Sequence, residues 1–297
     1  FIMIAVFGAS VTAQKITSKN PKGGYVDCLS VLFNKEIHRF GYGGQHLNGG
    51  GICLIDEVIQ KTPTVIFSDW FSTGYTEMND DMYQYINTII FKCTKVGIKI
   101  CWLFLPRRDQ PERVAFYNLI KEHLIKINSS FIDVSEFISL PYDDILTDLV
   151  HTNSVGSQLY ADIIYKEYNN IRNKIIYPCV TETKYCNIKY LEINKKFIKN
   201  MVIQTKSKSE LFALGIRIGP NSGYIEVNNT RYLLWDEYCH YERPQTIQIR
   251  EEINCDLQVK ILDDPVDYNT CRRDFDFKQI KFELDIQRIF YIGETPP

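Results

Sequence analysis

Residues 2–12 read IMIAVFGASVT, an apolar run that ends in a turn of small residues. The uninterrupted apolar stretch Ile2–Phe7 predicts a strand buried on both faces, because a half-solvated strand alternates apolar and polar side chains. The run is too short to span a membrane and lacks the basic residues that open a secretion signal. We therefore predict that it is the first strand of a parallel sheet, which ends at Gly8-Ala9-Ser10.

Similar apolar runs recur along the first part of the chain, and helical patterns separate them. We expect strands at residues 38–42, 64–68, 99–105 and 131–134, and helices at 25–35, 52–60, 80–96, 112–127 and 157–170. Doubly apolar strands that alternate with helices are typical of a parallel sheet covered on both faces, with right-handed crossovers. Residues 1–176 are thus predicted to form a three-layer α/β domain.

The pattern changes after Pro178. Short and mostly alternating segments occupy residues 188–193, 197–204, 211–218, 224–227, 230–234, 246–249, 257–261 and 279–284. Turn-forming clusters such as residues 219–223 and 263–265 divide them. This arrangement predicts a separate all-β domain over residues 177–297, an antiparallel sandwich or jelly roll.

Composition restricts the class of protein. The 297 residues are 45% hydrophobic and 24% charged, with a formal charge of -2, which gives no broad electrostatic case for nucleic acid or an anionic membrane. No run approaches the roughly 18 apolar residues of a spanning helix. Nine cysteines without a CxxC pair argue against a disulfide framework or a zinc site. We expect Cys28, Cys53, Cys93 and Cys101 to be reduced core residues, which favours a cytoplasmic location. A signal cleaved ahead of residue 1 would leave no trace in this sequence.

Ser10 follows the first expected strand, at the end where parallel sheets form their sites. Its hydroxyl would face the crevice, and its backbone N–H could donate to an oxyanion. The same residues also fit a plain turn in which Ser10 caps the next helix.

Asp148-Leu149-Val150-His151 lies just ahead of the last expected helix. This spacing lets the carboxylate reach one imidazole nitrogen, so that the other can accept a proton from a serine. A surface Asp and His near a helix start is the competing interpretation.

Gly41-Tyr42-Gly43-Gly44-Gln45 follows the second expected strand. Glycine permits close backbone approach, so an N–H here could also meet an oxyanion, although a flexible turn explains the glycines equally well. The chain has neither a GxxxxGK[ST] phosphate loop nor a GxSxG elbow.

Together, these segments resemble the conserved blocks of the SGNH (GDSL-like) hydrolases. Phe7–Thr12 is similar to the first block, Gly43-Gly44 to the second, and Asp148–Asn153 to the last, DxxH. The resemblance covers roughly residues 1–170. It implies a flavodoxin-like αβα sandwich that cleaves or transfers acyl groups, often acetyl esters on carbohydrates, without a metal or other cofactor.

The resemblance also implies the site residues. Ser10 would be the nucleophile, His151 the general base and Asp148 its orienting partner, while the N–H groups of Ser10 and Gly44 would be oxyanion donors. Gly43 would contact the substrate.

Two departures from the family pattern stand out. Ala9 replaces the usual Asp before the nucleophile, and the third block, at residues 68–74, lacks its Asn oxyanion donor. Trp70 lies nearest the missing Asn, with Ser72 or Thr73 as alternatives; losing one such donor costs a factor of about 10² to 10³ in rate. Residues 69–74 also resemble a stretch of SGNH-like proteins associated with bacterial surface polysaccharides.

Further substrate contacts are expected from Thr73 and from Arg107, which follows the fourth expected strand. Arg107 would hold an anionic group or else be a solvated loop charge. Aromatic residues of the second half would stack on sugars or belong to its core; these are Tyr224, Tyr232, Trp235 and Tyr238.

Three functions follow from these observations. The first is a serine-dependent esterase or O-acetyltransferase acting on a carbohydrate or an acylated small molecule. The second, suggested by the missing Asn, is a catalytically weak or inactive glycan-binding protein. The third is a lipid or thioester hydrolase, which would need an apolar acyl channel. The sequence does not indicate an oligomeric state.

Overall fold

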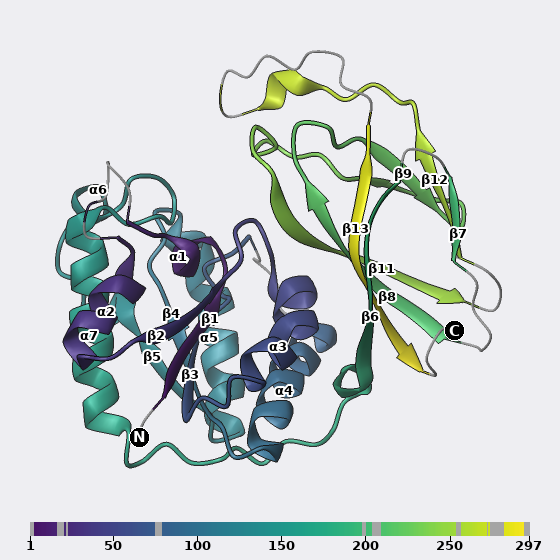
Figure 1. The fold of residues 1–297 in the computed structure, drawn as a ribbon. Helices are drawn as coiled ribbons and strands as arrows, with labels where there is room; N and C mark the ends of the chain where they lie inside the picture. The colour runs from purple at the N-terminus through teal and green to yellow at the C-terminus, as the bar shows by residue number, and fades with distance from the viewer. Residues whose placement is uncertain are drawn as a thin grey trace. The chain divides into compact units, whose positions relative to one another are not determined.

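The computed structural model describes residues 3–16, 21, 23–74, 79–197, 200–203, 209–253, 257–271, 273 and 282–293. The chain forms two compact units, Phe1–Cys186 and Asn187–Pro297 (Figure 1). The first unit extends to Cys186 instead of ending at residue 176. The reason is that Tyr185 is buried in this unit, where its hydroxyl donates to Asp81 (2.9 Å) and its ring lies 5.0 Å from that of Tyr85.

The first unit contains a five-stranded parallel sheet in the order β2-β1-β3-β4-β5. Its strands are β1 (Ile4–Gly8), β2 (Ile37–Gly41), β3 (Val65–Asp69), β4 (Lys99–Phe104) and β5 (Ser130–Asp133). This is the flavodoxin-like, doubly wound order. The predicted α/β class and every expected strand of this unit are confirmed.

Helices cover both faces of this sheet (Figure 1). The longer ones are α2 (Tyr25–Phe33), α3 (Ile52–Ile59), α4 (Asp80–Lys95), α5 (Gln110–Lys126) and α7 (Ser154–Ile171). Shorter turns are α1 (Ser10–Ala13), η1 (Leu47–Gly51), η2 (Val134–Phe137), α6 (Tyr142–Ile145) and η3 (Lys184–Asn187). No helix among the described ranges is both long and apolar enough to cross a bilayer.

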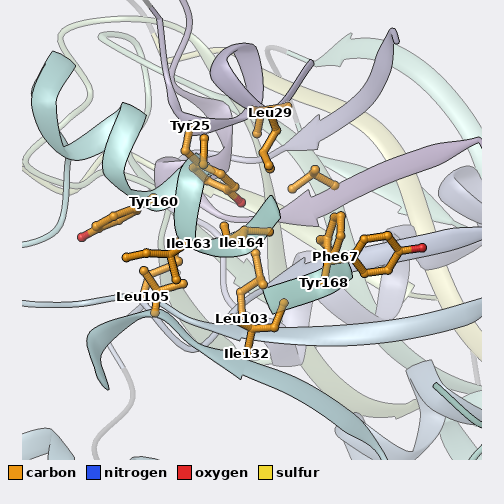
Figure 2. Packing of buried hydrophobic residues seen from close by; sticks show 14 of the residues in the cluster. Tyr25, Leu29, Phe67, Leu103, Leu105, Ile132, Tyr160, Ile163, Ile164 and Tyr168 are labelled. Atoms are coloured by element: carbon orange, nitrogen blue, oxygen red, sulfur yellow. The ribbon is translucent and has the colours of Figure 1, made fainter. Parts of the chain in front are cut away.

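One face of the sheet packs against α2 and α7 (Figure 2). Buried side chains from strands and helices form a single cluster there; they include Tyr25, Leu29, Phe67, Leu103, Tyr160 and Ile164. Side chains alternate along a strand, so Asp69, two residues after Phe67, belongs to this same face. The expected burial of Cys28, Cys53, Cys93 and Cys101 as free thiols is confirmed.

The opposite face carries a row of aromatic rings. Phe71 stacks on Trp102 and on Phe104, with 5.1 Å between centroids in each pair, and Phe104 meets Tyr117 of α5 edge-on at 5.2 Å. This packing fixes the start of the loop after β3 against β4 and α5, because aromatic pairs prefer these stacked and edge-on geometries.

The second unit contains two antiparallel four-stranded sheets, in the orders β10-β9-β12-β7 and β11-β8-β13-β6. The strands are β6 (Ile188–Phe197), β7 (Met201–Ile203), β8 (Ser209–Ile218), β9 (Tyr224–Val227), β10 (Thr230–Leu233), β11 (Arg243–Ile253), β12 (Leu257–Leu262) and β13 (Leu284–Gly293). Buried residues of both sheets share one core, among them Ile216, Ile225 and Val259. The predicted β-sandwich is confirmed.

The aromatic residues of this unit divide between core and surface. Trp235 is buried in the core and Tyr232 packs against it, with its hydroxyl bonded to Ile249 O (3.1 Å). Tyr224 is half-buried beneath the Arg231 guanidinium, 4.1 Å from its ring centroid. Tyr238 is also half-buried. Of the two roles considered for these aromatic residues, sugar stacking and core packing, Trp235 and Tyr232 therefore have the second.

Strand β13 was not expected from the sequence. It lies between β8 and β6, and its register shifts between Ile286 and Arg288. Such a bulge interrupts the two-residue alternation by which a strand is recognised. Half of the strand expected at residues 279–284, residues 279–281, lies outside the described residues, as do residues 198, 199 and 204 of the one expected at 197–204.

Replacing Tyr185 tests the boundary. We expect Tyr185→Ala to lower the free energy of unfolding of the first unit by about 3 kcal/mol, because it removes a buried aromatic ring and its hydrogen bond. The control is Tyr177→Ala, since Tyr177 is exposed and its hydroxyl donates to Gly97 O. Denaturant unfolding measures both variants. Equal effects would contradict the assignment of Tyr185 to this unit.

Candidate active site

Ser10 begins α1, directly after β1. The Ser10 turn (Gly8-Ala9-Ser10) lies close to the end of β3: Ala9 N–H donates to Asp69 O (3.0 Å), and a Cβ on Gly8 would come within 2.3 Å of that same oxygen. Only glycine fits such a close approach. The Ser10 side chain is half-buried, at the carboxyl end of the sheet where we expected it.

Asp148 and His151 form the hydrogen bond that their spacing predicts. Asp148 Oδ2 lies 2.8 Å from His151 Nδ1, while Oδ1 accepts the N–H groups of Val150 and His151 at 2.9 Å each. Thr147 N–H donates to His151 O (2.8 Å) and closes the loop around the pair. The ring is therefore held on its Nδ1 side, and Nε2 takes no part in this hydrogen bond.

The charge of Asp148 is secured by its partners. Partial burial raises the pKa of this carboxyl, but the His151 ring and the two backbone N–H donors outweigh it and hold the pKa well below its usual range. An ionised carboxylate only accepts hydrogen bonds, so Nδ1 of His151 carries the proton. This is the tautomer that a serine base requires.

Gln14 joins the Ser10 turn to the His151 loop (residues 147–152). Its amide donates to Thr152 O (3.0 Å), and its carbonyl oxygen accepts from Thr152 N–H (3.2 Å) and Thr152 Oγ1 (3.1 Å). Gln14 follows α1, which Ser10 begins, and Thr152 follows His151. The predicted nucleophile and the predicted base are thus carried by two directly bonded segments.

The glycine loop after β2 is bonded to the same turn. Tyr42 N–H donates to Gly8 O (2.9 Å), and Gly43 and Gly44 directly follow Tyr42 in the sequence. Gly44 has φ of +73°, a left-handed conformation that favours glycine. The predicted roles of Gly43 in substrate contact and of the Gly44 N–H as an oxyanion donor stay predictions.

Trp70, at the position nearest the missing Asn, is fully buried. Phe7 meets its ring edge-on at 5.0 Å, and Tyr42 stacks on it at 6.5 Å. Within the described part of the chain its indole Nε1 has no hydrogen-bond partner. Nearby, Thr73 Oγ1 donates to Trp70 O (2.9 Å). The roles of Trp70 as an oxyanion donor and of Thr73 as a substrate contact remain predictions.

Arg107 braces the loop after β3. Its guanidinium is largely buried, donates to Ser72 O (2.6 Å) and makes a two-pronged pair with Asp109 (2.7 and 2.8 Å). The next residue, Arg108, donates its N–H to Leu149 O (3.0 Å) and so joins this segment to the His151 loop. The sequence suggested either an anion ligand or a solvated charge for Arg107, and neither alternative predicted its hydrogen bonds to Ser72 and Asp109. Substrate contact by Arg107 stays a prediction.

Asp69 is a buried acid that sequence reasoning did not select. It ends β3 and is fully buried, and its carboxylate accepts from Ser72 Oγ (2.7 Å) and Thr12 Oγ1 (3.1 Å). Burial raises its pKa to about 6, although the two hydroxyls and the charge of His151 act in the opposite direction. The available signal was an acid directly after the apolar run of a predicted central strand.

No group of three acidic, histidine or cysteine side chains within the described ranges is arranged to hold a metal ion. Ser10 and the hydrogen-bonded Asp148–His151 pair thus lie on two segments, bonded to each other through Gln14 and Thr152, at the carboxyl end of a doubly wound sheet.

Comparison with known proteins supports the fold. No family model matches the chain, and no curated protein matches it in sequence. The crystal structure of a two-domain esterase (CEX) active on acetylated mannans is similar over 100% of this chain and 92% of its own, with a TM-score of 0.68 and 11% identity. The same esterase co-crystallized with mannopentaose gives 0.66 and 12%, with the same coverage. Both units therefore share the fold of a two-domain esterase.

Asp69→Asn should change stability in a pH-dependent way. The pKa of Asp69 in the folded state lies above its ordinary value of 3.8, so the free energy of unfolding of the wild type falls as pH rises from about 4 to about 6. Asparagine keeps the shape without the charge, and we expect the variant to be more stable than wild type at pH 7.5 by on the order of 2 kcal/mol.

Thermal unfolding at pH 4, 6 and 7.5 measures this effect, and the gain should disappear toward pH 4. Asp133→Asn is the matched control, because Asp133 is buried at the end of β5 but paired with Lys121. That variant should lose stability at pH 7.5. A loss of stability in Asp69→Asn at pH 7.5 would show that the burial cost is wrongly assigned.

Proposed function

We propose that this chain is an SGNH-type serine esterase that removes O-acetyl groups from a carbohydrate. The observation that carries the proposal is the Asp148–His151 pair on a loop that Gln14 bonds to the Ser10 turn. The fold shared with an esterase active on acetylated mannans supports the choice of substrate class.

The proposed reaction begins when Ser10 Oγ attacks the ester carbonyl carbon and gives its proton to His151 Nε2. Asp148 stabilises the imidazolium that forms. The carbonyl oxygen becomes an oxyanion, and the N–H groups of Ser10 and Gly44 are the predicted donors to it. When the intermediate collapses, the bond to the sugar oxygen breaks and His151 returns the proton to that oxygen.

The second half of the reaction distinguishes an esterase from a transferase. His151 takes a proton from the attacking water, which releases acetate and restores Ser10. If a sugar hydroxyl attacks in place of water, the acetyl group is transferred. The appearance of a labelled acetyl group on a second sugar, and not as free acetate, would favour transfer over the hydrolysis proposed here.

A second candidate is a glycan-binding protein with weak catalysis. The full burial of Trp70 favours it, because the third block presents neither the family's Asn nor an exposed indole at that position. This candidate predicts saccharide binding that is unchanged in Ser10→Ala and no reaction of Ser10 with a fluorophosphonate. The third candidate, a lipid or thioester hydrolase, predicts that activity rises with acyl chain length.

Ser10→Ala tests the nucleophile. We expect hydrolysis of p-nitrophenyl acetate and of acetylated mannan to fall by about a thousandfold or more, since the triad acts as a unit. Ser30→Ala is the control, because the Ser30 hydroxyl donates to Lys35 O, just beyond the end of α2. It should retain wild-type activity. Equal rates in wild type and Ser10→Ala would exclude the serine mechanism.

Asp148→Asn tests the orienting carboxylate. The asparagine oxygen can still accept the Val150 and His151 N–H groups, so the loop should keep its shape while the ring loses its charged partner. We expect kcat to fall by about 10² to 10⁴. The pKa of Asp148 is held well below its usual range, so this carboxyl should add no inflection to the wild-type pH–rate profile above pH 4. A kcat within twofold of wild type would contradict the assignment.

A further inference from the structure

Asp69 differs from three other acids of the first unit, buried Asp133 and half-buried Asp27 and Asp109, in having no cationic partner among the described residues. Asp27 pairs with Arg39, Asp109 with Arg107 and Asp133 with Lys121. No ion pair joins Asp69 to any residue in the described ranges. An unpaired buried carboxylate costs stability, which makes this position a candidate for a functional charge.

The contacts of Asp69 surround the Ser10 turn. Its backbone oxygen accepts Ala9 N–H (3.0 Å), and its side chain accepts Thr12 Oγ1 (3.1 Å), so it binds the residue before Ser10 and the second residue after it. Thr12 Oγ1 also lies 2.8 Å from the hydroxyl of Tyr25 in α2, which holds it from the other side. Asp69 is therefore hydrogen-bonded to residues on both sides of Ser10 in the sequence.

Four titratable groups interact electrostatically with Asp69. His151 comes from the loop before α7, Tyr160 from α7, Tyr25 from α2 and Tyr117 from α5. Burial raises the pKa of each tyrosine, so all three are neutral at physiological pH. The one group that gains a positive charge is His151, and that charge favours the ionised form of Asp69.

We propose that Asp69 is a positioning residue of the serine site. Its carboxylate fixes the Ser10 turn through Thr12, and it opposes the positive charge that forms on His151 when Ser10 gives up its proton. This inference rests on the proposed serine mechanism. Asp148 holds one ring nitrogen by a direct hydrogen bond, whereas Asp69 acts on the same ring through space.

The test compares kcat/KM for p-nitrophenyl acetate in wild type and Asp69→Asn from pH 5 to pH 8.5. Wild-type Asp69 is ionised only above about pH 6. The wild-type rate should therefore exceed that of the variant by about tenfold at pH 8, and the ratio should approach one at pH 5. A ratio that stays constant across this range, whatever its value, would overturn the proposal.

Thr12→Val is the second variant, and it keeps the carboxylate. Loss of the hydroxyl removes a donor that favours the charged form of Asp69, so the rise in kcat/KM that depends on Asp69 should move to higher pH. An unshifted profile would contradict the proposal even if Asp69→Asn does not fold. Asp133→Asn is the control, and its rate relative to wild type should not vary with pH.

Labelling by a fluorophosphonate separates this inference from the proposed function. If wild-type Ser10 is not labelled, the serine mechanism fails, and the role of Asp69 fails with it. If Ser10 is labelled but the ratio of wild type to Asp69→Asn is independent of pH, only the inference about Asp69 fails.

Discussion

The hydrogen bonds between Gln14 and Thr152 are the constraint on which the candidate site depends. They join segments 138 residues apart, one that follows the first strand and one that precedes the last helix of the sheet domain. A parallel sheet brings both segments to its carboxyl edge, but only direct bonds fix their spacing. The local Asp148–His151 bond orients the imidazole, and the Gln14 bridge ties its loop to the Ser10 turn.

The bonds around the site form two layers with different physical roles. Arg107 and Tyr117 hold the backbone of the loop after β3 from the side of β4 and α5. Asp69 and Thr12 hold the Ser10 turn from the side of α2 and α7. Rigid support of this kind fixes the geometry before substrate arrives, which is the condition for electrostatic stabilisation of an oxyanion. The unpaired charge of Asp69 is the part of this support that costs stability.

Local sequence patterns predicted the features of the fold and of the candidate site that depend on residues close together in the sequence. The apolar run before Ser10 predicted the first strand, and the three-residue spacing of Asp148 and His151 predicted their hydrogen bond. Contacts between distant segments could not be predicted in this way: nothing near Gln14 points to Thr152, and nothing near Asp69 points to Thr12. Strand β13 was missed because its bulge breaks the alternation.

Ser10 is proposed to be the nucleophile of an acyl transfer reaction. The most direct measurement is peptide mass spectrometry after the protein reacts with an alkyl fluorophosphonate. The serine mechanism predicts one adduct per chain on the peptide that contains Ser10, and none in His151→Ala, where the base is absent. An unlabelled Ser10 peptide, or labelling that is equal in the two proteins, would contradict it.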